Sequence, residues 1–86
     1  MIEKISSDGR MDSFKIDKEI GARVARLMKE RGVWLPEIPG GTWYHFDRCT
    51  CRYELDTDIF NIYNKNKDER TRAAQSLGLL PPRYDV

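Results

Sequence analysis

The sequence predicts an α+β protein in which a small antiparallel sheet is packed by two helices. Three patterns lead to this prediction: a helical pattern over about residues 17–31, an alternating pattern over about residues 42–55 and a second helical pattern over about residues 67–77. The order helix, hairpin, helix differs from the regular alternation that gives parallel βαβ units. At 86 residues the chain has the length of one small domain, so we assign residues 1–86 to a single globular domain.

The first helix is predicted from Asp17, whose side chain can cap the N-terminus, to Arg31. Gly32 is expected to end it in the left-handed conformation. Four apolar side chains recur at helical spacing and predict one buried stripe: Ile20, Val24, Leu27 and Met28. Two prolines and two glycines follow in residues 34–41, so we expect an ordered loop there rather than a regular element.

Residues 42–55 are predicted to form a β-hairpin whose turn centres on Arg48 and Cys49. Because side chains alternate along a strand, this register places three facing pairs on the apolar side: Phe46–Cys51, Tyr44–Tyr53 and Thr42–Leu55. The other side carries the facing pairs His45–Arg52 and Trp43–Glu54. The register is favoured because it separates apolar from polar side chains.

The second helix is predicted over residues 67–77, after a capping box formed by Asn66 and Glu69. One side of it carries Arg70, Ala73, Ala74 and Leu77, and Gly78 is expected to end it. Three segments stay open. Residues 2–5 fit a short strand, residues 14–16 fit a strand or an early start of the first helix, and residues 58–64 fit a helical turn or a third strand.

Composition excludes several classes of protein. The net charge of +1 argues against a general binder of polyanions, and no apolar run approaches the ~20 residues of a membrane span. The charged N-terminus does not resemble a signal peptide, and Cys49 and Cys51 are too close in sequence for an unstrained disulfide. We therefore expect a cytoplasmic protein with reduced thiols and no contact with membranes.

The charge is uneven along the chain. Residues 33–64 hold two basic and five acidic side chains, a net of −3, together with seven of the nine aromatic residues. Tryptophan, tyrosine and arginine are the side chains that most often anchor protein interfaces. The leading hypothesis is therefore a small non-enzymatic protein-binding module, such as a stand-alone regulator or inhibitor of phage or mobile-element type. Its expected binding residues are the following: Trp34, Trp43, His45, Arg52 and Glu54.

Two alternatives use other residues. A nucleic-acid-binding protein would use Arg23, Arg26 and Lys29 on the first helix, although Glu19 and Glu30 stand four residues from the arginines and can pair with them.

A metal or thiol site would use His45, Cys49 and Cys51, but zinc usually takes C-x2–4-C pairs, and this spacing is C-x-C. Arg48 and Arg52 could favour a thiolate on Cys49. Because the chain has a single histidine and no phosphate-binding glycine pattern, we expect no enzyme and no cofactor. The expected partner is another protein, with nucleic acid or a second copy of the chain as the other options.

Overall fold

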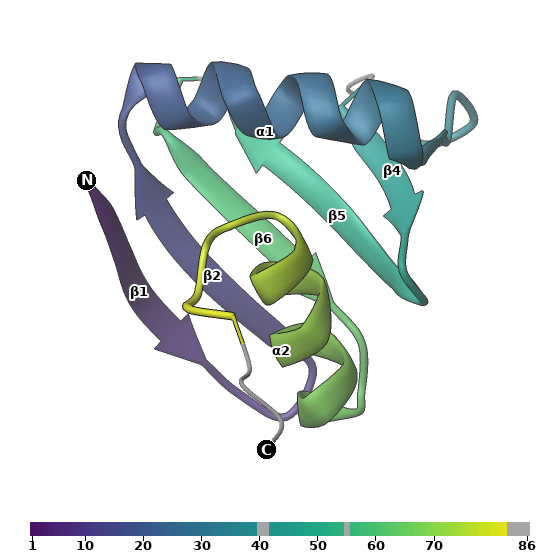
Figure 1. Ribbon diagram of the computed structural model, residues 1–86. Helices are drawn as coiled ribbons and strands as arrows, with labels where there is room; N and C mark the ends of the chain where they lie inside the picture. The colour runs from purple at the N-terminus through teal and green to yellow at the C-terminus, as the bar shows by residue number, and fades with distance from the viewer. Residues whose placement is uncertain (40–41, 55, 83–86) are drawn as a thin grey trace.

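A six-stranded antiparallel sheet with two helices forms the structure, so the α+β prediction is confirmed. The computed structural model describes residues 1–39, 42–54 and 56–82. The sheet has the strand order β1-β2-β6-β5-β4-β3, and both helices lie on the same side of it (Figure 1). The strands are β1 (Ile2–Ser7), β2 (Met11–Ile16), β3 (Val33–Trp34), β4 (Trp43–Phe46), β5 (Cys49–Glu54) and β6 (Ile59–Tyr63), and the helices are α1 (Lys18–Arg31) and α2 (Lys67–Ser76).

The three segments that the sequence left open are strands. Ile2–Ser7 and Met11–Ile16 form a hairpin at one edge of the sheet, and Ile59–Tyr63 pairs with both β2 and β5 at the centre. The expected Thr42–Leu55 pair, the glycines at 40–41 and the tail after residue 82 lie outside the described residues.

Strand alternation places the apolar side chains of β2, β4, β5 and β6 toward the helices. The core contains side chains from the sheet and both helices: Phe14, Ile16, Phe46, Cys49, Cys51, Tyr53, Phe60, Ile62, Val24, Met28, Ala73, Ala74, Leu77 and Leu79. The cross-strand pairs Phe14–Phe60 and Tyr53–Phe60 align the three central strands, so their apolar side chains form one surface for the helices to cover.

Helix α1 begins as predicted, because Asp17 Oδ1 accepts a hydrogen bond of 2.9 Å from the backbone N–H of Ile20. Its predicted stripe is confirmed: Val24 and Met28 are buried, and Ile20 and Leu27 pack against the core. The left-handed ending at Gly32 was wrong. Gly32 is extended, with φ −91° and ψ 171°, because the chain continues directly into β3 instead of turning back.

Helix α2 begins and ends where it was predicted, but only half of the capping box forms, because the N–H of Asn66 donates to Asn64 Oδ1 instead of to Glu69. Asn66 Oδ1 accepts hydrogen bonds from the backbone N–H groups of Asp68 and Glu69. At the other end Gly78 has φ +75°, and the N–H of Leu79 donates to the carbonyl of Ala74 at 2.8 Å, as in a Schellman ending. The predicted face of Arg70, Ala73, Ala74 and Leu77 is buried.

Arg70 is 1% exposed, and its guanidinium is enclosed by oxygen atoms. Its Nε lies 3.1 Å from Oδ1 of the fully buried Asp12 on β2. Its Nη1 donates to the carbonyls of Gly9 and Asn64, and its Nη2 donates to the carbonyl of Asp8 at 2.7 Å. One side chain of α2 therefore holds the β1–β2 turn, strand β2 and the segment before its own helix.

The hairpin has the predicted faces but a different turn. The observed pairs are Phe46–Cys49 and Trp43–Arg52, so the turn residues are Asp47 and Arg48 rather than Arg48 and Cys49. Both turn residues have positive φ, 47° and 67°, as a two-residue type I′ turn requires. The twist of a type I′ turn matches the right-handed twist of the two strands, which favours this turn although neither residue is glycine. Cys49, expected in the turn, is consequently a buried strand residue.

The Arg48→Gly variant should unfold with a free energy about 1 kcal/mol higher, because glycine adopts positive φ without the steric cost of a Cβ atom. The side chain of Arg48 is 78% exposed and its 3.4 Å contact with Glu69 contributes little. Urea unfolding measures the change. The control Arg48→Ala loses the same contact and keeps the strained backbone, so it should gain nothing. Equal free energies of unfolding for the two variants would contradict backbone strain at Arg48.

Candidate functional site

The side of the sheet opposite the helices carries the candidate site. We call it the open face and use the name for the residues of β2, β4, β5 and β6 that strand alternation places on that side: Met11, Ser13, Lys15, Trp43, His45, Thr50, Arg52, Glu54, Ile59, Asn61 and Tyr63. Both helices lie on the other side of the sheet (Figure 1), so no helix of the described chain covers this face. The apolar parts of such a face have to be shielded from water, either by its own side chains or by a partner.

Three large side chains form the centre of the open face. The rings of Trp43 and Tyr63 lie with their centroids 5.3 Å apart, at an interplanar angle of 36°. The guanidinium carbon of Arg52 lies 5.2 Å from the centroid of the Trp43 ring, a cation–π distance. Trp43 and Arg52 are cross-strand partners, so the backbone itself places them together. All three side chains are partly exposed.

A chain of polar contacts continues from this cluster across the face. Arg52 Nη1 lies 3.6 Å from Glu54 Oε1, and the same oxygen accepts a hydrogen bond of 3.1 Å from Asn61 Nδ2. Ser13 Oγ donates to Asn61 Oδ1 at 2.6 Å. Ser13 and Asn61 are each only 5% exposed, although no helix lies over them. The contacts therefore hold the side chains of the open face in fixed positions.

Four of the five predicted binding residues lie together on the open face: Trp43, His45, Arg52 and Glu54. No described helix covers Trp43, because both helices pack on the opposite side of the sheet. Trp34 does not join this group. It lies in β3 rather than in a loop, and it pairs with Tyr44, whose side chain faces the helix side. Trp34 is 53% exposed at the edge of the sheet.

Sequence reasoning missed Tyr63 and Asn61, which complete the cluster and the polar chain. Both belong to β6, a segment for which helix and strand remained open. The alternation of Ile59, Asn61 and Tyr63 with the apolar Phe60 and Ile62 was the available signal, because it places an amide and a phenol on the same face.

The structure separates the three residues of the metal alternative. Cys49 and Cys51 face the helices and His45 faces the other side, and no cluster of three metal-binding side chains occurs among the described residues. The surroundings of Cys49 also disfavour the thiolate that Arg48 and Arg52 were considered to promote. Burial, together with the carboxylate of Asp47, raises the pKa of the Cys49 thiol from 9.0 to about 11. Burial likewise raises the pKa of the Cys51 thiol.

The basic side chains of the nucleic-acid alternative lie on the exposed side of α1. Arg23, Arg26 and Lys29 are all exposed. Within the described residues, neither Glu19 nor Glu30 comes within ion-pair distance of the arginines, contrary to the sequence expectation. Arg23 instead contacts the carbonyl of Gly78 at 3.5 Å. These residues stand on the opposite side of the molecule from the open face.

In the described part of the chain no helix has the length and apolar character needed to cross a membrane. Compared with family models, with curated proteins and with solved structures, the chain has no match in any of the three.

Both thiols should react slowly with Ellman's reagent in the folded protein and rapidly in concentrated guanidinium chloride, because the thiolate is the reactive species and burial keeps it protonated. Below its ordinary pKa the thiol is neutral in both the folded and the unfolded chain. Between the ordinary and the raised pKa only the unfolded chain ionises, which favours unfolding. The contribution of the Cys49 thiol to the free energy of unfolding should therefore be constant below pH 9.0 and fall as the pH rises toward about 11. Urea unfolding across this range measures the fall.

The control for this pH dependence is Cys49→Ser, which should show a smaller fall. The fall should not vanish, because burial and the carboxylate of Asp58 also raise the pKa of Tyr53. A thiol that reacts at once in the folded protein would contradict the buried positions of both cysteines.

Proposed function

We propose that this protein is a small non-enzymatic binding module that contacts another protein through its open face. The observation that carries the proposal is the cluster of Trp43, Tyr63 and Arg52 on a sheet face that no described helix covers. These three residue types dominate the energetic centres of protein interfaces. A broad sheet face suits a protein surface better than a small substrate, which needs a concave site.

The fixed side chains of the open face support the same proposal. An interface residue that is already held in place loses less conformational entropy on binding than a free one. Arg52 is held by Trp43 and Glu54, and Glu54 is held by Asn61. The cluster thus resembles a preorganised anchor surrounded by polar groups, which is the usual anatomy of an interface.

The charge of the surrounding segment indicates the chemistry of the partner. The open face itself carries Lys15 and Arg52 against Glu54, but residues 33–64 around the cluster have a net charge of −3, and Glu37, Asp47 and Asp56 are exposed outside the strands. A partner that presents an apolar or aromatic anchor with basic side chains around it would complement this surface. A stand-alone regulator or inhibitor, cytoplasmic and of phage or mobile-element type, suits a domain of this size.

Nucleic-acid binding remains a second candidate because of one observation. The arginines of α1 have no acidic partner within ion-pair distance in the described residues, so Arg23, Arg26 and Lys29 present positive charge that no described carboxylate neutralises, although Arg23 contacts the carbonyl of Gly78. This candidate predicts affinity for DNA or RNA that falls steeply with added salt. It also predicts that Arg26→Ala weakens binding, whereas Trp43→Ala does not.

Trp43→Ala should weaken binding of the partner by about 30-fold, because removal of an interface anchor costs at least ~2 kcal/mol. The measurement has two steps. The wild-type chain captures its partner from a lysate of the native host, and mass spectrometry identifies it. Calorimetry with the purified partner then compares the wild type, Trp43→Ala and Arg52→Ala.

The matched control is Arg26→Ala, an exposed residue on the other side of the molecule, which should bind the partner as the wild type does. Thermal unfolding of each variant checks the fold. Two results would contradict the proposal: unchanged partner binding by Trp43→Ala, or loss of its cooperative unfolding transition, which would make Trp43 a structural residue.

A further inference from the structure

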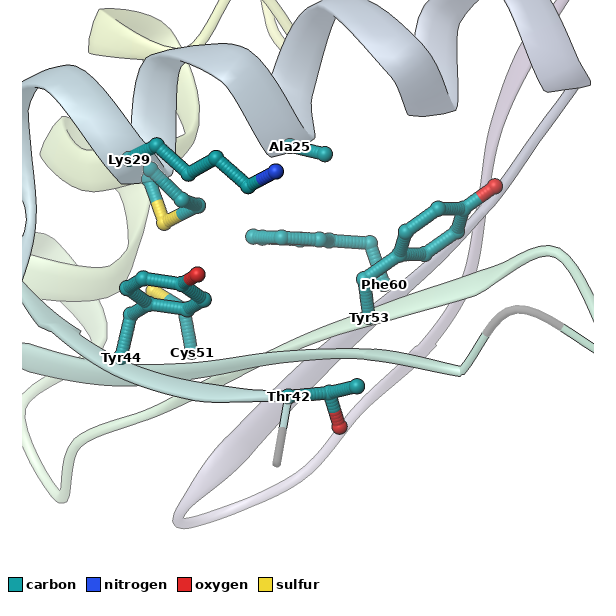
Figure 2. Close-up of a pocket in the computed structure, with 8 residues that line it drawn as sticks. Ala25, Lys29, Thr42, Tyr44, Cys51, Tyr53 and Phe60 are labelled. Atoms are coloured by element: carbon teal, nitrogen blue, oxygen red, sulfur yellow. The ribbon is translucent and has the colours of Figure 1, made fainter. Parts of the chain in front are cut away.

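A second candidate site lies on the helix side of the sheet. A cavity of about 290 Å³ separates α1 from strands β4, β5 and β6. Figure 2 shows it between the helix above and the strands below, with Tyr44 on one side and Tyr53 on the other. Its deeper wall consists of the buried side chains Met28, Cys51 and Phe60. Exposed or partly exposed side chains mark its mouth: Lys29, Thr42 and Tyr44.

The cavity follows from the side chains that α1 directs toward the sheet. Gly21 lets the helix lie directly on Tyr53, since a Cβ atom at this position would be 2.0 Å from the tyrosine hydroxyl oxygen. One helical turn later Ala25 fills little space, and Met28 packs into the core beyond it. The helix is thus supported at both ends of the cavity, and the small side chain between them leaves it open.

Two polar groups stand at the cavity with no partner among the described residues. In Figure 2 the Lys29 side chain extends along the helix side of the cavity, and the Tyr44 hydroxyl points toward the helix. Neither the Lys29 ammonium nor the Tyr44 hydroxyl forms an ion pair or hydrogen bond within the described part of the chain. The Tyr53 hydroxyl, in contrast, donates to Asp58 at 3.3 Å.

The lining carries one formal charge. Lys29 is the charged member of the lining, and the buried Cys51 thiol is neutral at physiological pH because burial raises its pKa. An apolar cavity with one unpaired cation and one unpaired hydroxyl at its mouth is complementary to an apolar body with one anionic oxygen group. A hydroxyl and an ammonium can both donate to a carboxylate.

We propose that this cavity binds a small aromatic carboxylate, with its ring beside Tyr44, Phe60 and Tyr53 and its carboxylate at Lys29 and the Tyr44 hydroxyl. The size agrees with this class of ligand. An apolar cavity of roughly 150 Å³ holds benzene, so one of about 290 Å³ holds a ring with a short acidic side chain or a fused bicyclic ring. The site is on the opposite side of the sheet from the open face, so it does not depend on the proposed protein partner.

The test uses three named probes: benzoate, phenylacetate and indole-3-acetate, each compared with its neutral amide. Titration is followed by NMR through the methyl signals of Ala25 and Met28, which line the cavity. At least one carboxylate should shift these signals with a dissociation constant tighter than about 1 mM. Its amide should bind at least tenfold more weakly, because it brings no charge to Lys29.

Two variants locate the site. Ala25→Leu should fill the cavity, retain or raise the thermal unfolding temperature and abolish binding. Lys29→Gln keeps the cavity and should remove the preference for the carboxylate over the amide without removing binding of the ring. Because Lys29 is exposed, this variant keeps the test decisive if Ala25→Leu fails to fold. Arg26→Gln is the matched control, because Arg26 is exposed on α1 three residues before Lys29 and does not line the cavity. It should bind as the wild type does.

Several results would overturn the proposal. The first is a titration in which none of the three carboxylates moves the Ala25 and Met28 signals. Equal affinity for carboxylate and amide would overturn the role of Lys29, and undiminished binding by a folded Ala25→Leu protein would place the ligand elsewhere. If the probes fail while Ala25→Leu loses a protein partner that the wild type captures, the cavity receives a side chain of that partner instead.

Discussion

The buried ion pair between Arg70 and Asp12 fixes how the parts of this small protein fit together. A guanidinium and a carboxylate removed from water are costly unless every polar atom finds a partner. Here the carbonyls of Asp8, Gly9 and Asn64 accept three hydrogen bonds from the Nη atoms of Arg70, and its Nε contacts Asp12 as an ion pair without a hydrogen bond. Asp12 Oδ1 also accepts a hydrogen bond of 2.7 Å from the Ser7 hydroxyl, and Asp12 Oδ2 lies 3.5 Å from the Lys4 ammonium. The edge hairpin, the centre of the sheet and α2 therefore meet at one charged contact.

This contact also explains why the protein has two different sides. Because Arg70 and Asp12 point to the same face, α2 is held on the side where α1 already packs, and the opposite side receives no helix among the described residues. The open face is covered by its own side chains instead, through the tilted contact of the Trp43 and Tyr63 rings and the polar contacts from Arg52 to Ser13. On the helix side, the small residues of α1 leave the cavity at Lys29. The two proposed sites are consequences of one arrangement.

Much of this arrangement could be predicted from local patterns. Both helices follow from apolar spacing and from the caps at Asp17 and Asn66. The faces of the hairpin were predicted although its register was wrong, because a shift of two residues leaves every side chain on the same face. The turn at Asp47 and Arg48 was missed because neither residue is glycine. The strand β6 could not be decided locally, since its partners β2 and β5 are brought to it by the fold. The sequence placed Arg70 on the apolar face of α2, but its partner could not be predicted, because Asp12 is brought beneath it only by the fold.

The most direct test of the Arg70–Asp12 contact is a double-mutant cycle with Arg70→Met and Asp12→Asn, measured by urea unfolding. Each single variant should lose about 3–5 kcal/mol, because it leaves a buried charge without its partner. The double variant should lose at least ~2 kcal/mol less than the sum of the two, since the two groups are in direct contact. The exposed Arg72→Met, on the same helix, should change stability by no more than about 0.5 kcal/mol. Single losses as small as that of the Arg72 control, or strictly additive losses, would contradict the central place of this ion pair.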